Sequence, residues 1–380
     1  MDEILIRVGE LFLKSEPVIR IFEKRLRENI KVALKREGIR FKITRTRGRL
    51  FVHTKEIKKA CDALKTVFGI VSFSPCYHLR TSSLKRIQNF CKRNYDKWIK
   101  RGQTFGVKVR RIGDHAYTSQ QLAKAVGDVI DRKVDLSKPD VEVGIEVRDN
   151  DCYIYTETIK GLGGLPVGVS GKVLCLISGG IDSPVAAWLM MKRGCKIALI
   201  HFHSFPLLSK RSIEKTKELA KVLKAYQRRI KIYFVPFQSI QTEIKTKVLA
   251  KYRIILYRRY MLRIAEAIAK RENAKALVTG ESLAQVSSQT LENIATIEAV
   301  TSMPVLRPLI GMDKSEIIDL AKKIKTYKVS IKPQEDCCTL FIPKHPATRS
   351  STKRIEELEK RLDTKMLVEK AIKASEAVQV

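Results

Sequence analysis

The feature that most constrains the fold is a regular alternation of short apolar strands with helices after residue 170. The expected strands are 172–177, 196–202, 229–237 and 275–279, and the expected helices are 183–192, 209–224, 239–270 and 314–324. Strands that are apolar throughout and separated by helices are typical of a parallel sheet covered on both faces. Such doubly wound α/β folds bind their ligands at the carboxyl ends of the strands.

The first of these strands runs directly into a glycine-rich loop and a helix. The loop has the sequence Ser-Gly-Gly-Ile-Asp-Ser at 178–183, with Gly179 and Gly180 at its centre. Glycines let backbone N–H groups approach a phosphate, and a helix N-terminus adds partial positive charge. We expect Ser178 and Ser183 to donate hydroxyls and Asp182 to hold Mg²⁺ or to orient the leaving group. We also expect Ser183 to cap the helix, with Pro184 at the first helical position.

This loop differs from the common nucleotide-binding loop. The Walker pattern needs Gly-x-x-x-x-Gly-Lys-Ser/Thr. The nearest candidate is Gly171-Lys172, which is followed by Val173 and has Pro166 where the first glycine should stand. The alternative, a chance glycine-rich turn, is disfavoured because the loop lies between a strand and a helix.

The first 165 residues mix short strands and helices without that alternation. Expected helices cover 17–36, 60–67, 84–98 and 119–132, and expected strands cover 4–8, 41–44, 49–53, 70–74, 105–111, 141–148 and 151–156. A connector rich in glycine follows at 161–171 and predicts a domain boundary near residue 165. The tail beyond Thr352 predicts a charged helix with an apolar side.

The excess of basic over acidic side chains predicts a polyanionic partner. The formal net charge is +34, from 74 basic and 40 acidic side chains. Like charges repel in the compact state, so such an excess indicates nucleic-acid binding rather than a contribution to stability. The alternative, a charge-rich thermophile surface, is disfavoured because thermophile enrichment raises both signs together.

The remaining composition favours a cytosolic enzyme. We find no transmembrane segment and no signal peptide. Eight cysteines in a chain of this length do not form a disulfide scaffold, so we expect reduced thiols. Cys337 and Cys338 stand out because they lie side by side on a polar segment between Pro333 and Pro343. The other six fit packed positions: Cys61, Cys76, Cys91, Cys152, Cys175 and Cys195.

The loop resembles the pyrophosphate (PP) loop of ATP pyrophosphatases, which split ATP between its α- and β-phosphates. Three further strings extend the likeness: Gly-Glu-Ser-Leu-Ala-Gln-Val-Ser-Ser-Gln-Thr at 280–290, Leu-Arg-Pro-Leu at 306–309 and Met-Asp-Lys-Ser-Glu-Ile at 312–317. With Arg-Val-Gly-Glu-Leu-Phe-Leu-Lys at 7–14, the whole chain resembles the tRNA 4-thiouridine synthetases, or ThiI family. The resemblance implies a ferredoxin-like domain at 1–59, an RNA-binding THUMP domain at 60–165 and a PP-loop catalytic domain at 166–380.

The resemblance also implies roles for individual residues. ATP is expected to contact the loop and the following set: Leu176, Ile177, His201, Phe202, Arg258, Gly280 and Gln289. Lys314 is expected to neutralise phosphate charge, and Cys337 to carry sulfur as a persulfide that Cys338 resolves. Without the resemblance, Arg258 and Lys314 fit ordinary salt bridges equally well.

The function implied is ATP-dependent thiolation of a tRNA uridine, in the family the one at position eight. The expected sulfur donor is a cysteine desulfurase persulfide or sulfide. The choice between them stays open, because the chain shows neither a C-terminal rhodanese domain nor a Cys-x-x-Cys pair. Some family members also act in thiamine thiazole synthesis. A homodimer would let an RNA-binding domain reach a distant site. Two alternatives stay open at this point: a PP-loop pyrophosphatase with another tRNA or small-molecule substrate, and a non-catalytic RNA-binding protein.

Overall fold

The computed structural model describes residues 1–9, 15–46, 48–333, 341 and 345–380. The chain divides into two compact units, Met1–Pro166 and Val167–Val380. Within the described part of the chain, no helix combines the length and the apolar character needed to cross a membrane.

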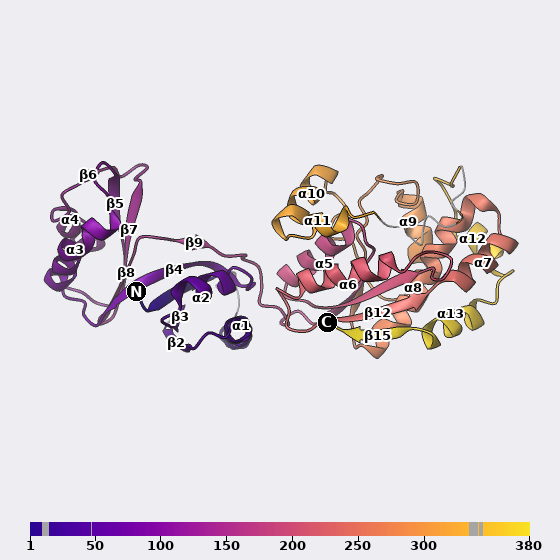
Figure 1. Ribbon diagram of the computed structural model, residues 1–380, viewed down its shortest axis with the longest axis horizontal. Coiled ribbons are helices and arrows are strands. Elements are labelled where there is room, and N and C mark those ends of the chain that lie inside the picture. The colour runs from indigo at the N-terminus through magenta and orange to yellow at the C-terminus, as the bar shows by residue number, and fades with distance from the viewer. Residues whose placement is uncertain (10–14, 47, 334–340, 342–344) are drawn as a thin grey trace. The chain divides into compact units, whose positions relative to one another are not determined.

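The first unit is built on one nine-stranded sheet in the order β2-β3-β1-β4-β8-β7-β5-β6, with β9 paired to β4 (Figure 1). The long strand β4 joins the two halves, because it pairs with β1 near its start and with β8 at Tyr77–Leu79. The strands are β1 Glu3–Val8, β2 Lys42–Thr46, β3 Arg49–His53, β4 Ile70–Leu79, β5 Thr104–Ile112, β6 Lys133–Val134, β7 Val141–Arg148, β8 Asp151–Tyr155 and β9 Ile159–Lys160.

Each half of this sheet has its own pair of helices and its own core. The helices are α1 Glu16–Arg36, α2 Ile57–Leu64, α3 Leu84–Trp98 and α4 Ser119–Gly127. Leu26 and Ile30 of α1 pack with Ile4 and Ile6 of β1 in the first core. Helix α4 ends five residues before its predicted end, because Gly127 is a poor helix former.

The second unit contains a six-stranded sheet in the order β14-β13-β10-β11-β12-β15. The strands are β10 Lys172–Leu176, β11 Lys196–His203, β12 Lys231–Pro236, β13 Ala276–Val278, β14 Val305–Leu306 and β15 Glu376–Gln379. Five strands are parallel, which confirms the predicted doubly wound α/β architecture. The edge strand β15 runs antiparallel to β12, and the sequence analysis missed it because four residues carry almost no periodicity.

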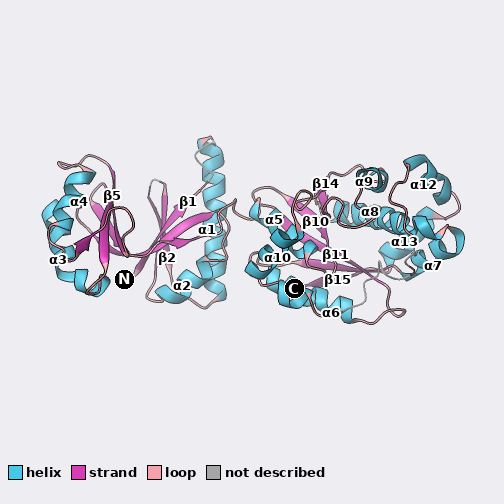
Figure 2. Cartoon of the chain, turned by 90° about the horizontal axis from the view of Figure 1, so that it is seen from above, coloured by secondary structure: helices cyan, strands magenta, loops and turns pink. Residues whose placement is uncertain are grey.

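Helices cover both faces of this sheet. Figure 2 shows α5, α6 and α10 on one side of the strands and α8 and α13 on the other. The helices are α5 Asp182–Lys192, α6 Arg211–Leu223, α7 Gln238–Lys247, α8 Arg253–Arg271, α9 Leu291–Glu298, α10 Lys314–Lys323, α11 Tyr327–Ser330, α12 Thr352–Glu359 and α13 Thr364–Lys373.

Two long helices of the sequence analysis are divided in the structure. The predicted helix 239–270 is split into α7 and α8, because Val248 has an extended backbone with φ −128° and ψ 144°. A single 3-10 turn, Ala250–Tyr252, follows it. The predicted C-terminal helix is split into α12 and α13. Its apolar positions, Ile355 and Leu358 among them, are buried in the main core as expected.

Candidate nucleotide-binding site

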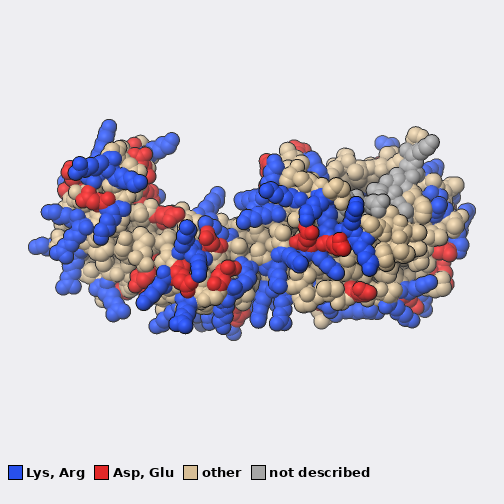
Figure 3. All heavy atoms as spheres, in the orientation of Figure 1, with Lys and Arg blue, Asp and Glu red and all other residues tan. Residues whose placement is uncertain are grey.

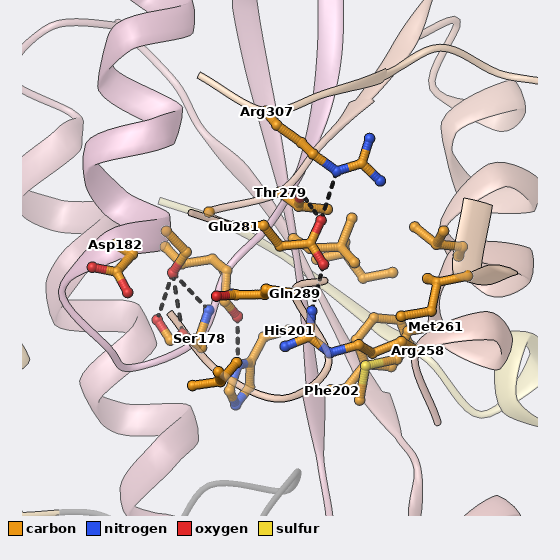
Figure 4. A pocket seen from close by; sticks show the side chains of 18 of the residues that line it. Ser178, Asp182, His201, Phe202, Arg258, Met261, Thr279, Glu281, Gln289 and Arg307 are labelled. Atoms are coloured by element: carbon orange, nitrogen blue, oxygen red, sulfur yellow. Dashed lines mark hydrogen bonds and ion pairs between the residues drawn. The ribbon is translucent and has the colours of Figure 1, made fainter. Parts of the chain in front are cut away.

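A pocket of about 290 Å³ lies where the parallel strands end, as the fold predicts. Its walls come from the ends of β10, β11 and β13, from the PP-loop and from one side of α8 (Figure 4). The pocket is lined by Leu176, Ile177, Ser178, Asp182, Ser183, Ile200, His201, Phe202, Arg258, Met261, Leu262, Thr279, Gly280, Glu281, Gln285, Val286, Gln289, Ile297 and Arg307.

The PP-loop is closed by its own two serines. The hydroxyl of Ser183 accepts a hydrogen bond of 2.9 Å from the backbone N–H of Ser178, and the Ser178 hydroxyl accepts one of 3.2 Å from the N–H of Gly180. Helix α5 begins at Asp182, so Ser183 is its second residue and not the predicted cap, and Pro184 is its third residue and not the predicted first. The serine that resembles a helix cap instead fixes the loop, because its hydroxyl reaches back across it.

Asp182 is held between two donors from distant parts of the chain. Lys314 Nζ lies 2.6 Å from Asp182 Oδ1, and Gln285 Nε2 donates to Asp182 Oδ2 at 3.1 Å. Lys314 is the first residue of α10, and Gln285 follows β13. Asp182 and Lys314, two separately predicted site residues, therefore meet at the PP-loop.

A buried carboxylate organises the opposite wall of the pocket. Glu281 is 6% exposed and forms ion pairs with Arg258 Nη1 and with Arg307 Nε, the latter at 2.8 Å. Thr279 Oγ1 also donates to Glu281 at 2.8 Å. Burial alone would raise the pKa of Glu281, but the two guanidinium groups outweigh burial and lower it. This carboxylate is therefore ionised at neutral pH (Figure 4).

Between these two charged walls the lining is largely apolar. Leu176, Ile200, Phe202, Met261 and Leu262 contribute aliphatic or aromatic surface. His201 also lines the pocket, but its ring Nδ1 lies 2.9 Å from the carbonyl oxygen of Ile177. Because a carbonyl can only accept, Nδ1 carries the proton, and His201 fixes the strand end that precedes the PP-loop.

Two polar atoms in this pocket indicate that it is fitted to a polar ligand. Gln289 Oε1 and Arg258 Nε are buried and have no hydrogen-bond partner among the described residues. Such atoms are costly unless a ligand or water satisfies them. Gly280 packs so tightly that a Cβ there would lie 2.8 Å from the Cα of Ser183. Any larger residue would push the polar string at 279–290 away from the PP-loop.

Most of the predicted site residues meet in this pocket. Ten line it: Leu176, Ile177, Ser178, Asp182, Ser183, His201, Phe202, Arg258, Gly280 and Gln289. Gly179 and Gly180 belong to the loop without lining the cavity, and Cys337 and Cys338 lie outside the described residues. The sequence analysis did not single out Glu281 or Arg307, although both belong to strings that it quoted. Each is the single charged residue of its string, a signal that ordinary surface residues share.

The six cysteines expected to be packed are all buried free thiols. Burial raises the pKa of the Cys91 thiol to about 12, and burial followed by Glu157 raises that of Cys61 to about 11. Thiols with such pKa values are protonated at neutral pH and are poor nucleophiles. These six residues are therefore structural, as predicted.

Comparison with known proteins identifies the family. The family described as Thiamine biosynthesis protein (ThiI) matches residues 168–364. The ThiI ferredoxin-like domain matches residues 3–74, and the THUMP domain matches residues 82–157. The chain belongs to the ThiI family of tRNA sulfurtransferases. This result confirms the resemblance from the motifs and the order of ferredoxin-like, THUMP and PP-loop parts.

Individual members of the ThiI family are similar over the whole chain. A probable tRNA sulfurtransferase of Brevibacillus brevis is 44% identical, over 100% of this chain and 96% of its own length. One of Caldanaerobacter subterraneus is 43% identical, over 97% of each chain. Among solved structures, a 4-thiouridine synthetase in complex with RNA and bound ATP superposes with a TM-score of 0.90. It is 36% identical, and the match covers 100% of both chains.

Proposed function

We propose that this ThiI-family protein binds ATP in the pocket above the PP-loop, adenylates the C4 oxygen of a tRNA uridine and replaces that oxygen with sulfur. In the family the uridine is the one at position eight. The observation that carries the proposal is the pocket itself. It joins an apolar slot to a PP-loop in a chain that matches, end to end, a 4-thiouridine synthetase solved with RNA and ATP.

The adenine of ATP would occupy the apolar slot beside Leu176, Phe202 and Met261. The unsatisfied Gln289 Oε1 and Arg258 Nε supply an acceptor and a donor there for the nucleotide. The triphosphate would lie over Gly179, Gly180 and the N-terminus of α5, where backbone N–H groups and the helix dipole favour negative charge.

Asp182 is the residue that we assign to Mg²⁺. Among the described residues, no group of three or more His, Cys, Asp or Glu could hold a metal ion. One carboxylate together with phosphate oxygens and water is nevertheless a usual Mg²⁺ environment. The two oxygens of Asp182 each accept one hydrogen bond and keep further lone pairs. When bound, the ion would offset the charge that develops on the leaving pyrophosphate.

In the first step the uridine C4 oxygen attacks the α-phosphorus, and the bond to pyrophosphate breaks. The proton on uridine N3 leaves as a C4–N3 double bond forms. Lys314 lies at the PP-loop beside Asp182, where its ammonium would stabilise negative charge on the phosphates. Positioning and charge neutralisation would provide most of the rate.

In the second step the terminal sulfur of a Cys337 persulfide attacks C4, and AMP leaves with the former uridine oxygen. The Cys338 thiolate then attacks Cys337, which releases 4-thiouridine and leaves a disulfide. A thiol reductant would reduce that disulfide to two thiols, and a desulfurase persulfide would then transfer its terminal sulfur to Cys337. With sulfide as the donor, sulfide would instead attack the disulfide at Cys337, which forms the Cys337 persulfide and releases the Cys338 thiolate. The described residue Ser330, which precedes this pair in the chain, donates a 3.2 Å hydrogen bond to the carbonyl of Gly180.

The test combines unmodified tRNA, Mg-ATP and a sulfide or persulfide source with the wild type, Asp182→Ala and Cys337→Ser. AMP release and the near-ultraviolet absorbance of thiouridine are followed together. We expect Asp182→Ala to lose both signals and Cys337→Ser to lose thiouridine. AMP release that does not depend on RNA, without thiouridine, would favour a pyrophosphatase with another substrate.

A further inference from the structure

The connection between β11 and α6 forms a compact turn at residues 204–210. The backbone N–H of Leu208 donates a 3.0 Å hydrogen bond to the carbonyl of Ser204. Ser204 is 2% exposed, and its hydroxyl donates to Gln241 of α7 at 2.6 Å. The base of the turn is therefore fixed in the protein interior.

The tip of this turn carries an aromatic side chain in an unusual place. Phe205 is 40% exposed, and no other Phe, Tyr or Trp among the described residues is classed as exposed. A single exposed apolar residue needs no explanation by itself. A phenyl ring displayed on an anchored turn, directly beyond a strand that lines a nucleotide pocket, is a more specific arrangement.

A basic side chain lies over the ring, and a second one follows it in the chain. Lys210 Nζ lies 4.8 Å from the centre of the Phe205 ring, and Arg211 opens α6. On the face shown in Figure 3, lysine and arginine side chains gather over α6, α10 and α11, with a group of acidic side chains among them. Within α6, Glu218 is paired with Lys332. An aromatic ring beside cations is how proteins bind single-stranded nucleic acid, by stacking a base and holding its phosphates.

The turn lies within reach of the PP-loop. Phe205 follows His201 by four residues, and the His201 ring is hydrogen-bonded to Ile177, the residue before Ser178. Four extended residues span at most about 14 Å. A base that contacts Phe205 can therefore approach the phosphates bound over the PP-loop.

We propose that Phe205 is the surface on which the target uridine stacks when it leaves the RNA helix, with Lys210 and Arg211 holding the adjoining phosphates. A stacked, paired base cannot present its C4 oxygen to a phosphorus atom, so an enzyme acting on the base must extrude it. Stacking on Phe205 would replace the stacking on neighbouring bases that the uridine loses when it leaves the helix. This inference rests on the proposed function, because it assigns a uridine to the same site.

The test compares Phe205→Ala, Phe205→Tyr and Phe205→Trp with the wild type in tRNA thiolation. We expect Phe205→Ala to lower kcat/KM for tRNA by roughly 5- to 150-fold, the range that base–aromatic stacking gives on alanine substitution. Phe205→Tyr and Phe205→Trp should stay within about threefold of the wild type, because every aromatic face can stack a base. The Kd for ATP and the melting temperature should be unchanged in all three.

Leu249→Ala is the control, since Leu249 is 54% exposed in the same unit and lies in the connection between α7 and α8. Its kcat/KM for tRNA should equal that of the wild type. A second measurement follows the fluorescence of Phe205→Trp, after subtraction of the wild-type signal. We expect quenching by intact tRNA but not by a transcript that lacks the base at the target position.

The possible failures can be told apart. Wild-type protein that makes no thiouridine would contradict the proposed function. Thiolation by the wild type with equal activity in Phe205→Ala would overturn the stacking proposal alone. Equal losses in Phe205→Ala and Phe205→Trp, or a weakened Kd for ATP in Phe205→Ala, would also overturn it.

Discussion

Glu281 is the residue on which the charge balance of the pocket depends. Its carboxylate holds Arg258, which lines the nucleotide pocket, and Arg307, whose Nη1 also pairs with Glu298 at 2.6 Å. Burial alone would lower the pKa of Arg307, but Glu281 and Glu298 raise it. Two guanidinium groups are thus held in place by one buried acid, which we regard as a positioning residue.

We expect Glu281→Gln to lower kcat/KM for ATP at least tenfold, a loss of about 1.4 kcal/mol in transition-state binding. The amide keeps the shape of the side chain but no longer holds Arg258 by charge. Steady-state kinetics with varied ATP would measure the change.

Glu298→Gln is the matched control, because Glu298 contacts Arg307 and is 38% exposed at its side chain. It should leave kcat/KM for ATP within about threefold, as expected for a partly exposed pair. Equal effects of the two substitutions would mean that Glu281 does not position Arg258.

The sequence predicts which residues line the pocket better than it predicts the ion pairs among them. The PP-loop, His201 and Gln289 are marked by motif and by strand ends. The ion pairs of Glu281 join residues from α8, from the loop after β13 and from the segment after β14. Pairing of charges that lie far apart in the sequence depends on tertiary packing, so it cannot be predicted from local periodicity.

Among the elements, α8 is held to the C-terminal helix α12 by a buried ion network. Arg259 is 1% exposed and donates to both carboxylate oxygens of Glu359, at 3.0 and 2.8 Å. Arg263 donates to the same two oxygens at 2.6 and 2.8 Å. Because α8 also carries Arg258 and Met261, this network fixes one wall of the nucleotide pocket.

We expect Glu359→Ala to lower the free energy of unfolding by about 3–5 kcal/mol, because it removes the buried carboxylate that accepts hydrogen bonds from buried Arg259. Glu356→Ala is the control: Glu356 lies 3.9 Å from Arg259, is 55% exposed and should cost under about 1 kcal/mol. Urea unfolding of both variants would measure the difference. Similar losses of unfolding free energy in Glu359→Ala and Glu356→Ala would show that the ion pairs of Glu359 do not hold α12 to α8.

The hydrogen bonds of Glu272, which follows α8, predict that the stability of the fold depends on pH. It accepts hydrogen bonds from Lys172, from Tyr233 and, at 2.7 Å, from Lys231. Burial would raise the pKa of Glu272, but these bonds outweigh burial and lower it to about 2. A carboxyl with a depressed folded-state pKa stabilises the fold fully above its unfolded pKa, and the stabilisation is lost as pH falls toward the folded value.

We therefore expect the urea midpoint of the wild type to exceed that of Glu272→Gln by a constant amount above about pH 5. The gap should narrow between about pH 4.5 and pH 2, where the unfolded and then the folded carboxyl become protonated. A difference in urea midpoint that does not change with pH would show that the charge of Glu272 does not stabilise the fold.

For the whole molecule, the alternation of apolar strands and helices was sufficient to predict a doubly wound sheet. The same reasoning missed β15, β14 and α9, which are short elements whose conformation depends on their neighbours. In the first unit, the strand pairing through β4 could not be foreseen, because register in a mixed sheet depends on contacts far apart in sequence. The fold class thus follows from local patterns, while the edges and the strand order do not.

The central claim is that this pocket activates the oxygen of a tRNA uridine. The most direct test uses tRNA transcribed with ¹⁸O at the C4 oxygen of uridine, together with Mg-ATP, a persulfide source and the wild-type protein. Mass spectrometry of the released AMP then follows the label. We predict one ¹⁸O in AMP for each thiouridine formed, because AMP leaves with the uridine oxygen. Thiouridine accompanied by unlabelled AMP would contradict the account, since the adenylate would then have formed on another atom.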